Sequence, residues 1–250
     1  MARRTALVTG ASRGIGRAIA LRLARDGAAV AVNYRERSDQ ADEVVAAIHR
    51  AGGQAVAIAA DVANPADCVR LVAAAREAFG PIDILVNNAG IFRKGDLADF
   101  DPVAMGAMRS VNVDGLICVT RAVAADMQTR RWGRIVNIAS IAALGTISAG
   151  TTFYAATKAE VISLTRRFAL VLGPHGITVN AIAPGFIETD MASQSGADFA
   201  ALAAKAMVRR VGTPDDIAAA AAYLVSEEAG FVTAQVLTVD GGRTDYIAHP

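Results

Sequence analysis

The sequence predicts an α/β fold in which a parallel sheet is covered by helices on both faces. Short apolar, β-branched runs alternate with longer segments of helical period along the chain. Several runs, such as Ile84–Val86, are apolar without interruption, and no Pro/Gly/Ser-rich linker divides the 250 residues. Alternation of strand and helix implies right-handed crossovers between parallel strands. We therefore expect a single domain over residues 1–250.

The expected strands are short and rich in valine, isoleucine and alanine. In chain order they are Ala6–Val8, Ala29–Val32, Ala55–Ile58, Ile84–Val86, Ile135–Ile138, Thr178–Ile182 and Val236–Val239. Continuously apolar strands are buried on both sides, so we expect them inside a sheet that helices cover.

The segments between these strands have the apolar period of helices. We expect helices over Ile15–Asp26, Asp39–Ala51, Pro65–Phe79, Val103–Met127 and Tyr154–Leu172. Glycine follows most of them and is the usual residue just past a helix end: Gly27, Gly52, Gly53, Gly80 and Gly173.

Charge and hydropathy exclude several classes of function. The formal net charge is +1 and the arginines are scattered, which is not the footprint of a nucleic-acid-binding surface. The first apolar run, Thr5–Val8, is too short for a signal sequence or a membrane span. We expect a cytoplasmic protein that binds neither nucleic acid nor membrane.

The cysteines and histidines indicate no metal site. Cys68 and Cys118 lie far apart, inside apolar helical patterns, so we interpret them as buried thiols rather than as a disulfide or metal ligands. The three histidines have no ligand spacing.

A glycine-rich segment follows the first strand and opens the first helix. Gly10, Gly14 and Gly16 would make the tight turn and let a pyrophosphate approach the backbone at the helix N-terminus. The alternative is a tight turn with no ligand. We predict dinucleotide binding by this loop, through Gly10, Ser12, Arg13, Gly14, Ile15 and Gly16.

The end of the second strand bears on which dinucleotide binds. An acidic residue here would accept hydrogen bonds from the ribose hydroxyls of NAD, but the residues are Asn33, Tyr34 and Arg35. Arg35 and Arg13 would instead clasp a 2′-phosphate with bidentate hydrogen bonds. The alternative, for either arginine taken alone, is a solvated charge on the surface. We predict that NADP(H) is preferred and that NAD(H) is also possible.

Two further strand ends carry polar residues where parallel sheets bind ligands. Asp61 and Val62 follow the third strand, and Asn88, Ala89 and Gly90 follow the fourth. We predict that both groups line the cofactor channel. The alternatives are that Asp61 caps the helix near Pro65 and that the second group is turn chemistry alone.

Tyr154 and Lys158 lie four residues apart on an expected helix, so their side chains share one face. A phenol has a pKa of about 10, and a nearby ammonium favours its ionised form, which would make it a proton relay near neutral pH. A chance pairing on a solvated helix face is the alternative.

Taken together, these residues resemble the short-chain dehydrogenases/reductases over the whole chain. The matching marks are Thr9–Gly16, Asn87–Gly90, Asn112, Ser140, Tyr154, Lys158, Pro184, Gly185 and Thr189. The resemblance implies a single Rossmann-type, doubly wound domain with a seven-stranded parallel sheet, and usually a homotetramer. It also implies cofactor contacts from Tyr154, Lys158, Pro184, Gly185, Ile187 and Thr189.

The resemblance implies a role for each catalytic residue. Ser140 would hydrogen-bond the substrate carbonyl, Tyr154 would donate the proton, and Lys158 would lower the pKa of Tyr154 while it holds the nicotinamide ribose. Asn112 would position a water that links Lys158 to solvent.

Within this family the chain looks most like 3-oxoacyl-[acyl-carrier-protein] reductases, through Gly176–Met191. Two departures bear on the substrate. The loop between Ser140 and Tyr154 carries one residue more than those reductases usually have. Their carrier-protein surface is basic, and although Arg130 and Arg131 match part of it, His175 stands where an arginine is expected.

The segment of about residues 186–212 is expected to close over the substrate. Its apolar residues either line the pocket or form an amphipathic helix that packs on the body: Met191, Phe199, Leu202 and Met207.

We therefore predict an NADP(H)-dependent enzyme that interconverts a ketone and a secondary alcohol. Its expected substrate is a 3-oxoacyl thioester, free or on a carrier protein, or a similar ketone. The alternative is a dehydrogenase of a sugar, polyol or cyclic alcohol, for which the polar candidates are Thr146, Ser148, Thr151 and Thr152. A remote alternative from another class is a cofactor-binding regulator without turnover.

Overall fold

The computed structural model describes residues 4–146, 148–189, 198–243 and 245. Within them, seven strands form one sheet in the order β3-β2-β1-β4-β5-β6-β7, and every neighbouring pair is parallel. The strands are β1 (Thr5–Val8), β2 (Ala29–Tyr34), β3 (Gln54–Ala59), β4 (Ile84–Asn87), β5 (Gly133–Ile138), β6 (Ile177–Pro184) and β7 (Val236–Val239). All seven expected strands are present, and the predicted α/β fold is confirmed.

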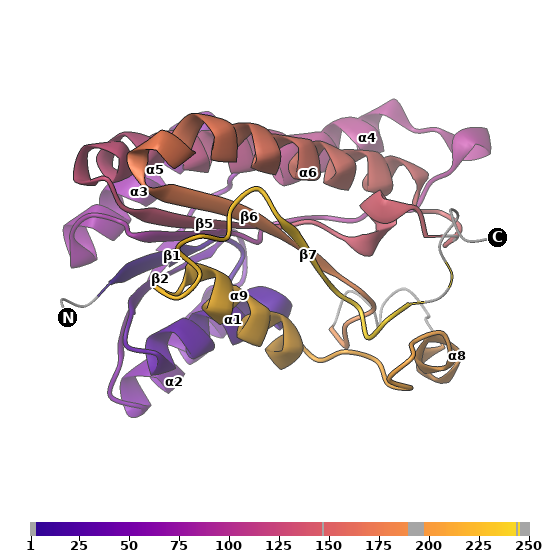
Figure 1. The fold of residues 1–250 in the computed structure, drawn as a ribbon, viewed down its shortest axis with the longest axis horizontal. Coiled ribbons are helices and arrows are strands. Elements are labelled where there is room, and N and C mark those ends of the chain that lie inside the picture. The colour runs from indigo at the N-terminus through magenta and orange to yellow at the C-terminus, as the bar shows by residue number, and fades with distance from the viewer. Residues whose placement is uncertain (1–3, 147, 190–197, 244, 246–250) are drawn as a thin grey trace.

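Helices cover both faces of the sheet (Figure 1). On one face lie α1 (Gly14–Arg25), α2 (Ser38–Arg50) and α9 (Pro214–Val225). On the other lie α3 (Pro65–Phe79), α5 (Gly115–Arg130) and α6 (Thr152–Leu172), with α4 (Pro102–Arg109) near the start of α6. The short α8 (Phe199–Ala204) stands apart from both layers.

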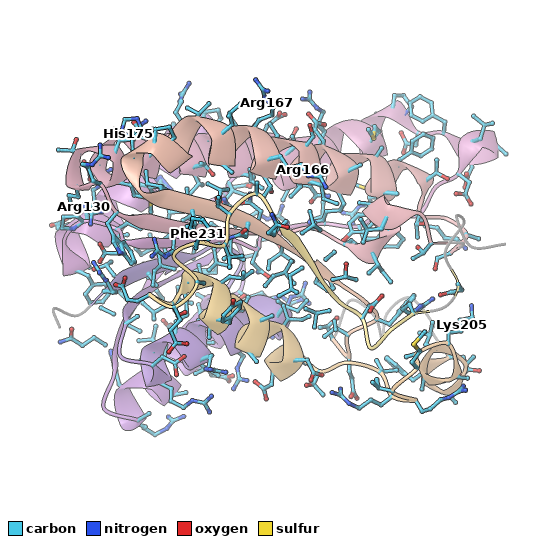
Figure 2. The ribbon with its side chains drawn as sticks, viewed as in Figure 1. Arg130, Arg166, Arg167, His175, Lys205 and Phe231 are labelled. Carbon is cyan, nitrogen blue, oxygen red and sulfur yellow. The ribbon has the colours of Figure 1, made fainter. Side chains whose placement is uncertain are left out.

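Labelled charged residues identify the end of the molecule where the strands begin and the end where they finish. Asp83, just before β4, forms ion pairs with Arg4 and Arg130 at the edge where the strands begin. Figure 2 places Arg130 and His175 near this end and Lys205 at the opposite end. The carboxyl ends of the strands therefore face the end that carries Lys205.

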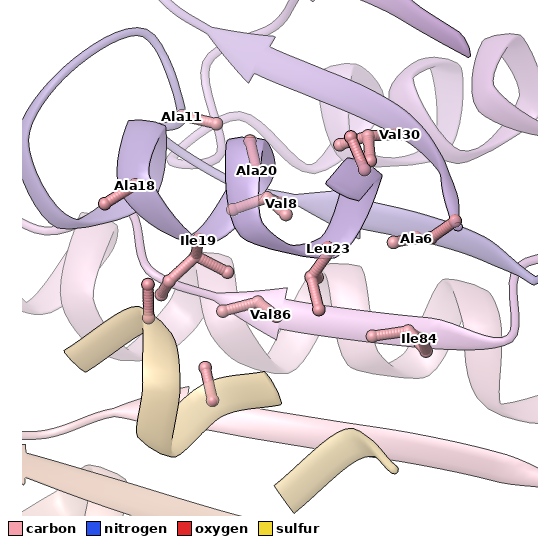
Figure 3. Packing of buried hydrophobic residues seen from close by; sticks show 14 of the residues in the cluster. Ala6, Val8, Ala11, Ala18, Ile19, Ala20, Leu23, Val30, Ile84 and Val86 are labelled. Atoms are coloured by element: carbon pink, nitrogen blue, oxygen red, sulfur yellow. The ribbon is translucent and has the colours of Figure 1, made fainter. Parts of the chain in front are cut away.

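Successive residues of each strand pack into opposite layers, as the pleat requires. Ala6 and Val8 of β1 contact the layer of α1, where Ile19 and Leu23 pack on the sheet (Figure 3). Leu7, between them, faces the α3 and α5 layer. All five side chains are almost fully buried. Because both faces are covered, the strands are apolar throughout.

A chain of buried hydrogen bonds ties the sheet to α6. The amide of Asn87 donates to Thr120 (3.0 Å) and to Asn137 (2.8 Å), and the amide of Asn137 donates to the hydroxyl of Thr165 on α6 (2.9 Å). Buried polar networks of this kind fix the relative position of the elements that they join.

The helix expected over Val103–Met127 is interrupted. A π-helical turn, η2 (Ser110–Asp114), separates α4 from α5. Its residue Asn112 is buried and hydrogen-bonded outside the helix, which stabilises the wider turn locally. Apolar periodicity does not report such a single-turn insertion, so the sequence predicted one helix. In the part of the chain that the structure describes, no helix combines the length and apolarity that crossing a membrane requires.

Candidate active site

A cleft of about 750 Å³ opens at the carboxyl ends of the strands. Ligands of open parallel sheets bind at this edge. Every residue that the sequence predicted to contact the cofactor lines the cleft: Gly10, Ser12, Arg13, Gly14, Ile15, Gly16, Asn33, Tyr34, Arg35, Asp61, Val62, Asn88, Ala89, Gly90, Tyr154, Lys158, Pro184, Gly185, Ile187 and Thr189. The topology thus gathers residues from six segments of the chain around one cavity.

Two glycines of the loop at one end of the cleft, Gly10 and Gly16, have no room for a side chain. Gly10 has a φ of +60°, and a Cβ on it would lie 2.9 Å from the Cα of Ala89. A Cβ on Gly16 would lie 2.4 Å from the side-chain amide of Asn88, which donates to the carbonyls of Thr9 and Gly10 at 2.9 Å each. Asn88 is therefore more than a turn residue, because it fixes the loop against the end of β4.

Asn33 supports the same loop from the other side. Its side-chain oxygen accepts from the amide of Gly10 (3.1 Å), and its backbone carbonyl accepts from Ala11 (2.7 Å). The start of α1, with Gly14 and Gly16, lines the cleft, which fits the binding of a pyrophosphate at a helix N-terminus.

The arginines predicted to hold a 2′-phosphate lie at this end. Arg13 is in the glycine loop, and Arg35 forms ion pairs with Glu36 (2.6 Å) and Asp61 (4.0 Å). The alternative role for Asp61, capping α3, is wrong, because the side chain that caps that helix belongs to Asn64.

Three predicted catalytic residues meet in the middle of the cleft. Ser140 follows β5, and its side chain hydrogen-bonds the phenol of Tyr154 on α6. One turn further along α6, the ammonium of Lys158 donates to the carbonyl of Ile138 (2.7 Å) and lies 5.8 Å from the centre of the Tyr154 ring.

Burial governs the acidity of both groups. It raises the pKa of Tyr154 to about 12, and the hydrogen bond with Ser140 acts in the opposite direction. Burial lowers the pKa of Lys158 to about 8. The expectation that Lys158 lowers the pKa of Tyr154 toward neutrality is therefore wrong, because burial outweighs it. Tyr154 is neutral at pH 7 and has a proton to give, while most Lys158 side chains keep their charge.

Asn112 lies just behind the cleft. Its side chain holds the loop after β4, accepting from the amide of Ile91 (2.8 Å) and donating to the carbonyl of Ile91 (3.0 Å) and to Thr157 (3.1 Å). A Cβ on Gly90 would lie 3.3 Å from the Asn112 oxygen and 3.4 Å from the Lys158 nitrogen. Asn112 and Lys158 thus both lie against Gly90.

Comparison with known proteins identifies this arrangement. A family model described as enoyl-(acyl carrier protein) reductase matches residues 10–244. The chain belongs to the short-chain dehydrogenase/reductase family. It is an oxidoreductase of that family, whose members interconvert alcohols and ketones.

Similar proteins match this dehydrogenase/reductase over nearly their full length. The short-chain reductase protein NovJ of Streptomyces niveus is 44% identical, with 95% of this chain and 93% of that protein covered. A 3-oxoacyl-[acyl-carrier-protein] reductase of Synechocystis sp. is 42% identical, with 95% of each covered. A crystal structure of a short-chain dehydrogenase from Burkholderia cenocepacia in complex with NADP superimposes with a TM-score of 0.88 and 44% identity, covering 96% of this chain and 97% of that one.

The part of the cleft around Tyr154 in this short-chain dehydrogenase/reductase contains residues that the sequence did not single out. Phe92 packs edge-on against Tyr154, with ring centres 5.3 Å apart, and lines the cleft. Lys94 lies over Gly150, where a Cβ would come within 2.5 Å of the lysine stem. Both belong to an irregular segment without a periodic pattern. All three lysines of the chain, Lys94, Lys158 and Lys205, line the cleft.

Of the predicted polar candidates, Thr146, Ser148 and Thr151 line the cleft. The hydroxyl of Thr152 instead donates to Asp96 (2.5 Å).

Of the apolar candidates in the segment of about residues 186–212, Leu202 lines the cleft. Met207 is 70% exposed, so it neither lines the cleft nor packs on the body as part of an amphipathic helix. Phe199 opens α8 and is half-buried. Met191 lies outside the described residues.

The basic residues considered for carrier-protein docking have structural partners. Arg130 binds Asp83 and the carbonyl of Ile82 (2.5 Å), and Arg131 donates to the carbonyl of Pro174 (3.0 Å). They lie with His175 at the end where the strands begin, away from this chain's own cleft (Figure 2).

Both cysteines of the enzyme are free thiols. Cys68 is buried, donates to the carbonyl of Val62 (3.2 Å), and has its pKa raised to about 12 by burial. Among the described residues, no three side chains of Cys, His, Asp or Glu are grouped so as to hold a metal ion.

Proposed function

We propose that this short-chain dehydrogenase/reductase is an NADP(H)-dependent enzyme that reduces a 3-oxoacyl thioester or a similar ketone to the secondary alcohol, and catalyses the reverse reaction. The observation that carries the proposal is the convergence of Ser140, Tyr154 and Lys158 in the same cleft as the glycine loop. When bound, the reduced nicotinamide supplies the hydride.

The protein's own residues supply the proton and orient the ketone. A ketone oxygen placed within reach of both hydroxyls of the Ser140–Tyr154 pair would accept one hydrogen bond from each side chain. As negative charge develops on that oxygen, Tyr154 donates its proton, and the charge of Lys158 favours the resulting phenolate. Asn112, which like Lys158 lies against Gly90, is placed to lead a proton from solvent to the lysine through water.

Two arginines support the preference for NADP(H). Arg13 and Arg35 flank the part of the cleft beyond the glycine loop, and a 2′-phosphate there would form bidentate hydrogen bonds with their guanidinium groups. The similar dehydrogenase from Burkholderia cenocepacia was solved in complex with NADP. Use of NAD(H) remains the alternative, since Glu36 is beside Arg35 and also lines the cleft.

A thioester substrate is supported by the similarity to the 3-oxoacyl-[acyl-carrier-protein] reductase of Synechocystis sp.. The hydroxyls of Thr146, Ser148 and Thr151 at the substrate end favour the second candidate, a dehydrogenase of a sugar, polyol or cyclic alcohol. A regulator without turnover is the third candidate, but such a protein has no need of the full set of Asn112, Ser140, Tyr154 and Lys158.

We also propose that the enzyme is a cytoplasmic homotetramer. Leu170 and Val171 on α6 and Val103 on α4 are each at least 60% exposed, and burial of such residues between subunits would stabilise an assembly. Molar mass from light scattering tests this, and the mass of a single chain would contradict it.

The activity is tested by following the consumption of NADPH and of NADH with acetoacetyl-CoA, beside a panel of cyclic ketones, diketones and ketoses. Thioester reduction with NADPH supports both the substrate class and the role of the arginines. Activity confined to small ketones or sugars selects the second candidate. Tight cofactor binding without turnover on any substrate, by wild type and Tyr154→Phe alike, selects the third.

A further inference from the structure

The start of the helix that carries Tyr154 and Lys158 is hydrogen-bonded to a residue from a distant part of the chain. The N-cap residue of α6 is Thr151, but its hydroxyl donates to the carbonyl of Ser148 (2.6 Å) instead of capping the helix. The carboxylate of Asp96 lies beside this helix start. One of its oxygens accepts from the hydroxyl of Thr152 (2.5 Å) and the other from the amide of Gly150 (2.6 Å).

Asp96 is itself held in place by a short turn. It is the N-cap of the 3₁₀ helix η1 (Leu97–Asp99), where Asp96 and Asp99 form a reciprocal capping box. The amide of Asp96 donates to Asp99 at 2.6 Å. Such a box holds the backbone of the capping residue, and therefore the position of its carboxylate.

Backbone contacts reinforce the connection. The amide of Gly95 donates to the carbonyl of Gly150 (3.0 Å), and Gly95 and Thr151 form an isolated parallel bridge. The segment that Asp96 holds is a wall of the cleft, because Ser148 and Thr151 line it while Asp96 does not. Asp96 thus acts on the cleft only through its neighbours.

The negative charge of the Asp96 carboxylate is favourable beside the N-terminus of α6. The hydrogen bond from Thr152, followed by that from Gly150, lowers the pKa of the carboxyl, so the group is ionised at neutral pH. A negative charge at the N-terminus of a helix is favourable, because the backbone amides there carry a partial positive charge.

We propose that Asp96 is a positioning residue that sets the substrate wall at residues 148–152 and the first turn of the catalytic helix, and so the approach of the ketone to Tyr154. This inference rests on the proposed function for its kinetic consequences. Its structural part stands on the contacts alone.

The test compares Asp96→Asn with Asp99→Asn. Both changes are isosteric and remove one negative charge from the same turn, but only the first leaves one of two donors, Thr152 or Gly150, without its acceptor. With a prochiral ketone, we expect Asp96→Asn to lower kcat/KM by about tenfold or more, since small displacements of reacting groups have large effects on rate. The enantiomeric excess of the alcohol should fall, while the Kd for NADPH stays within about twofold of wild type, a free-energy change well below the 1.36 kcal/mol of a tenfold effect.

Asp99→Asn should keep the wild-type rate and selectivity. Thr152→Ser should also keep them, because it retains the hydroxyl, whereas Thr152→Val should reproduce part of the defect. If Asp96→Asn lowers only the melting temperature and leaves kcat/KM and enantiomeric excess unchanged, Asp96 has no positioning role and the proposal is overturned.

Hydrogen–deuterium exchange separates this proposal from the proposed function. In Asp96→Asn we expect faster exchange at residues 148–154 and unchanged exchange in the glycine loop at residues 10–16. If the wild type reduces no ketone, the proposed function fails and the exchange data alone decide the role of Asp96. Unchanged exchange at residues 148–154 would overturn it in either case.

Discussion

The side chains of Ser140 and Tyr154 are hydrogen-bonded to each other in the cleft, although one follows a strand and the other begins a helix. The loop between them carries the η3 turn (Ile141–Leu144) and the wall that Asp96 holds. Because Tyr154 is buried and its pKa is raised to about 12, the phenol is protonated at neutral pH and can act as a proton donor.

Tyr154→Phe should abolish most of the activity and leave cofactor binding intact. The phenyl ring keeps the packing against Phe92 but has no proton to donate. A positioned proton donor contributes about 10²- to 10⁴-fold to the rate, so kcat should fall by that factor. Tyr223→Phe on α9, 48% exposed and outside the cleft, is the matched control and should be fully active. Full activity of Tyr154→Phe would remove the tyrosine from the mechanism.

Replacing the arginines of the cofactor end should change the preference between the two cofactors. Arg13→Ser and Arg35→Ser should each lower kcat/KM with NADPH by about tenfold and leave that with NADH nearly unchanged, because only NADPH has the 2′-phosphate. Arg50→Ser, at the exposed end of α2, controls for loss of surface charge. Equal losses with both cofactors would refute the assignment.

Gly16→Ala should damage both stability and cofactor affinity. The added methyl group would lie 2.4 Å from both the Asn88 amide and the Gly10 carbonyl, so the loop must shift. Overpacking of this kind costs about 1–3 kcal/mol of unfolding free energy. Gly106→Ala in α4 is the opposite case, since nothing lies within 4 Å of its new methyl group, and it should gain about 0.5–1 kcal/mol from helix propensity. Urea unfolding and titration with NADPH measure both effects.

Lys158 should make stability depend on pH in the alkaline range. Burial lowers its pKa from 10.5 to about 8, so between these values the unfolded chain binds more protons than the folded one. The free energy of unfolding therefore gains a rising contribution from about pH 8 to 10.5, and the full cost of burying the charge is present below pH 8. Tyr154 acts oppositely from pH 10.0 to about 12, because its pKa is raised.

The comparison of wild type with Lys158→Met isolates this effect. The variant should be the more stable protein at pH 7, and its advantage should shrink as the pH rises through 8 toward 10. An advantage that stays constant over this range would show that the lysine is not destabilised by burial.

Much of the fold follows from local sequence because each strand lies between two helical layers. Residues such as Leu7 and Val8 are apolar whichever layer they face, and the resulting runs stand out from their surroundings. The π-helical turn at Asn112 was not predictable, because one inserted residue leaves the apolar pattern on either side intact.

The residues of the site also divide into those that a local sequence pattern predicts and those that it does not. Tyr154 and Lys158 were found because a helix fixes their spacing, and the glycine loop because backbone sterics demand glycine. Phe92 and Asp96 were not found, since both act across irregular segments. Asp96 and Thr152 are 56 residues apart, and no local pattern relates them.

The distribution of lysine makes the enzyme a selective target for amine chemistry. All three lysines line the cleft, and the other cationic side chains are arginines. Acylating reagents, dyes and activated resins would therefore react at the N-terminal amine and inside the cleft. Random labelling or immobilisation through amines would inactivate the protein, and protection by bound nucleotide would report how fully the cleft is occupied.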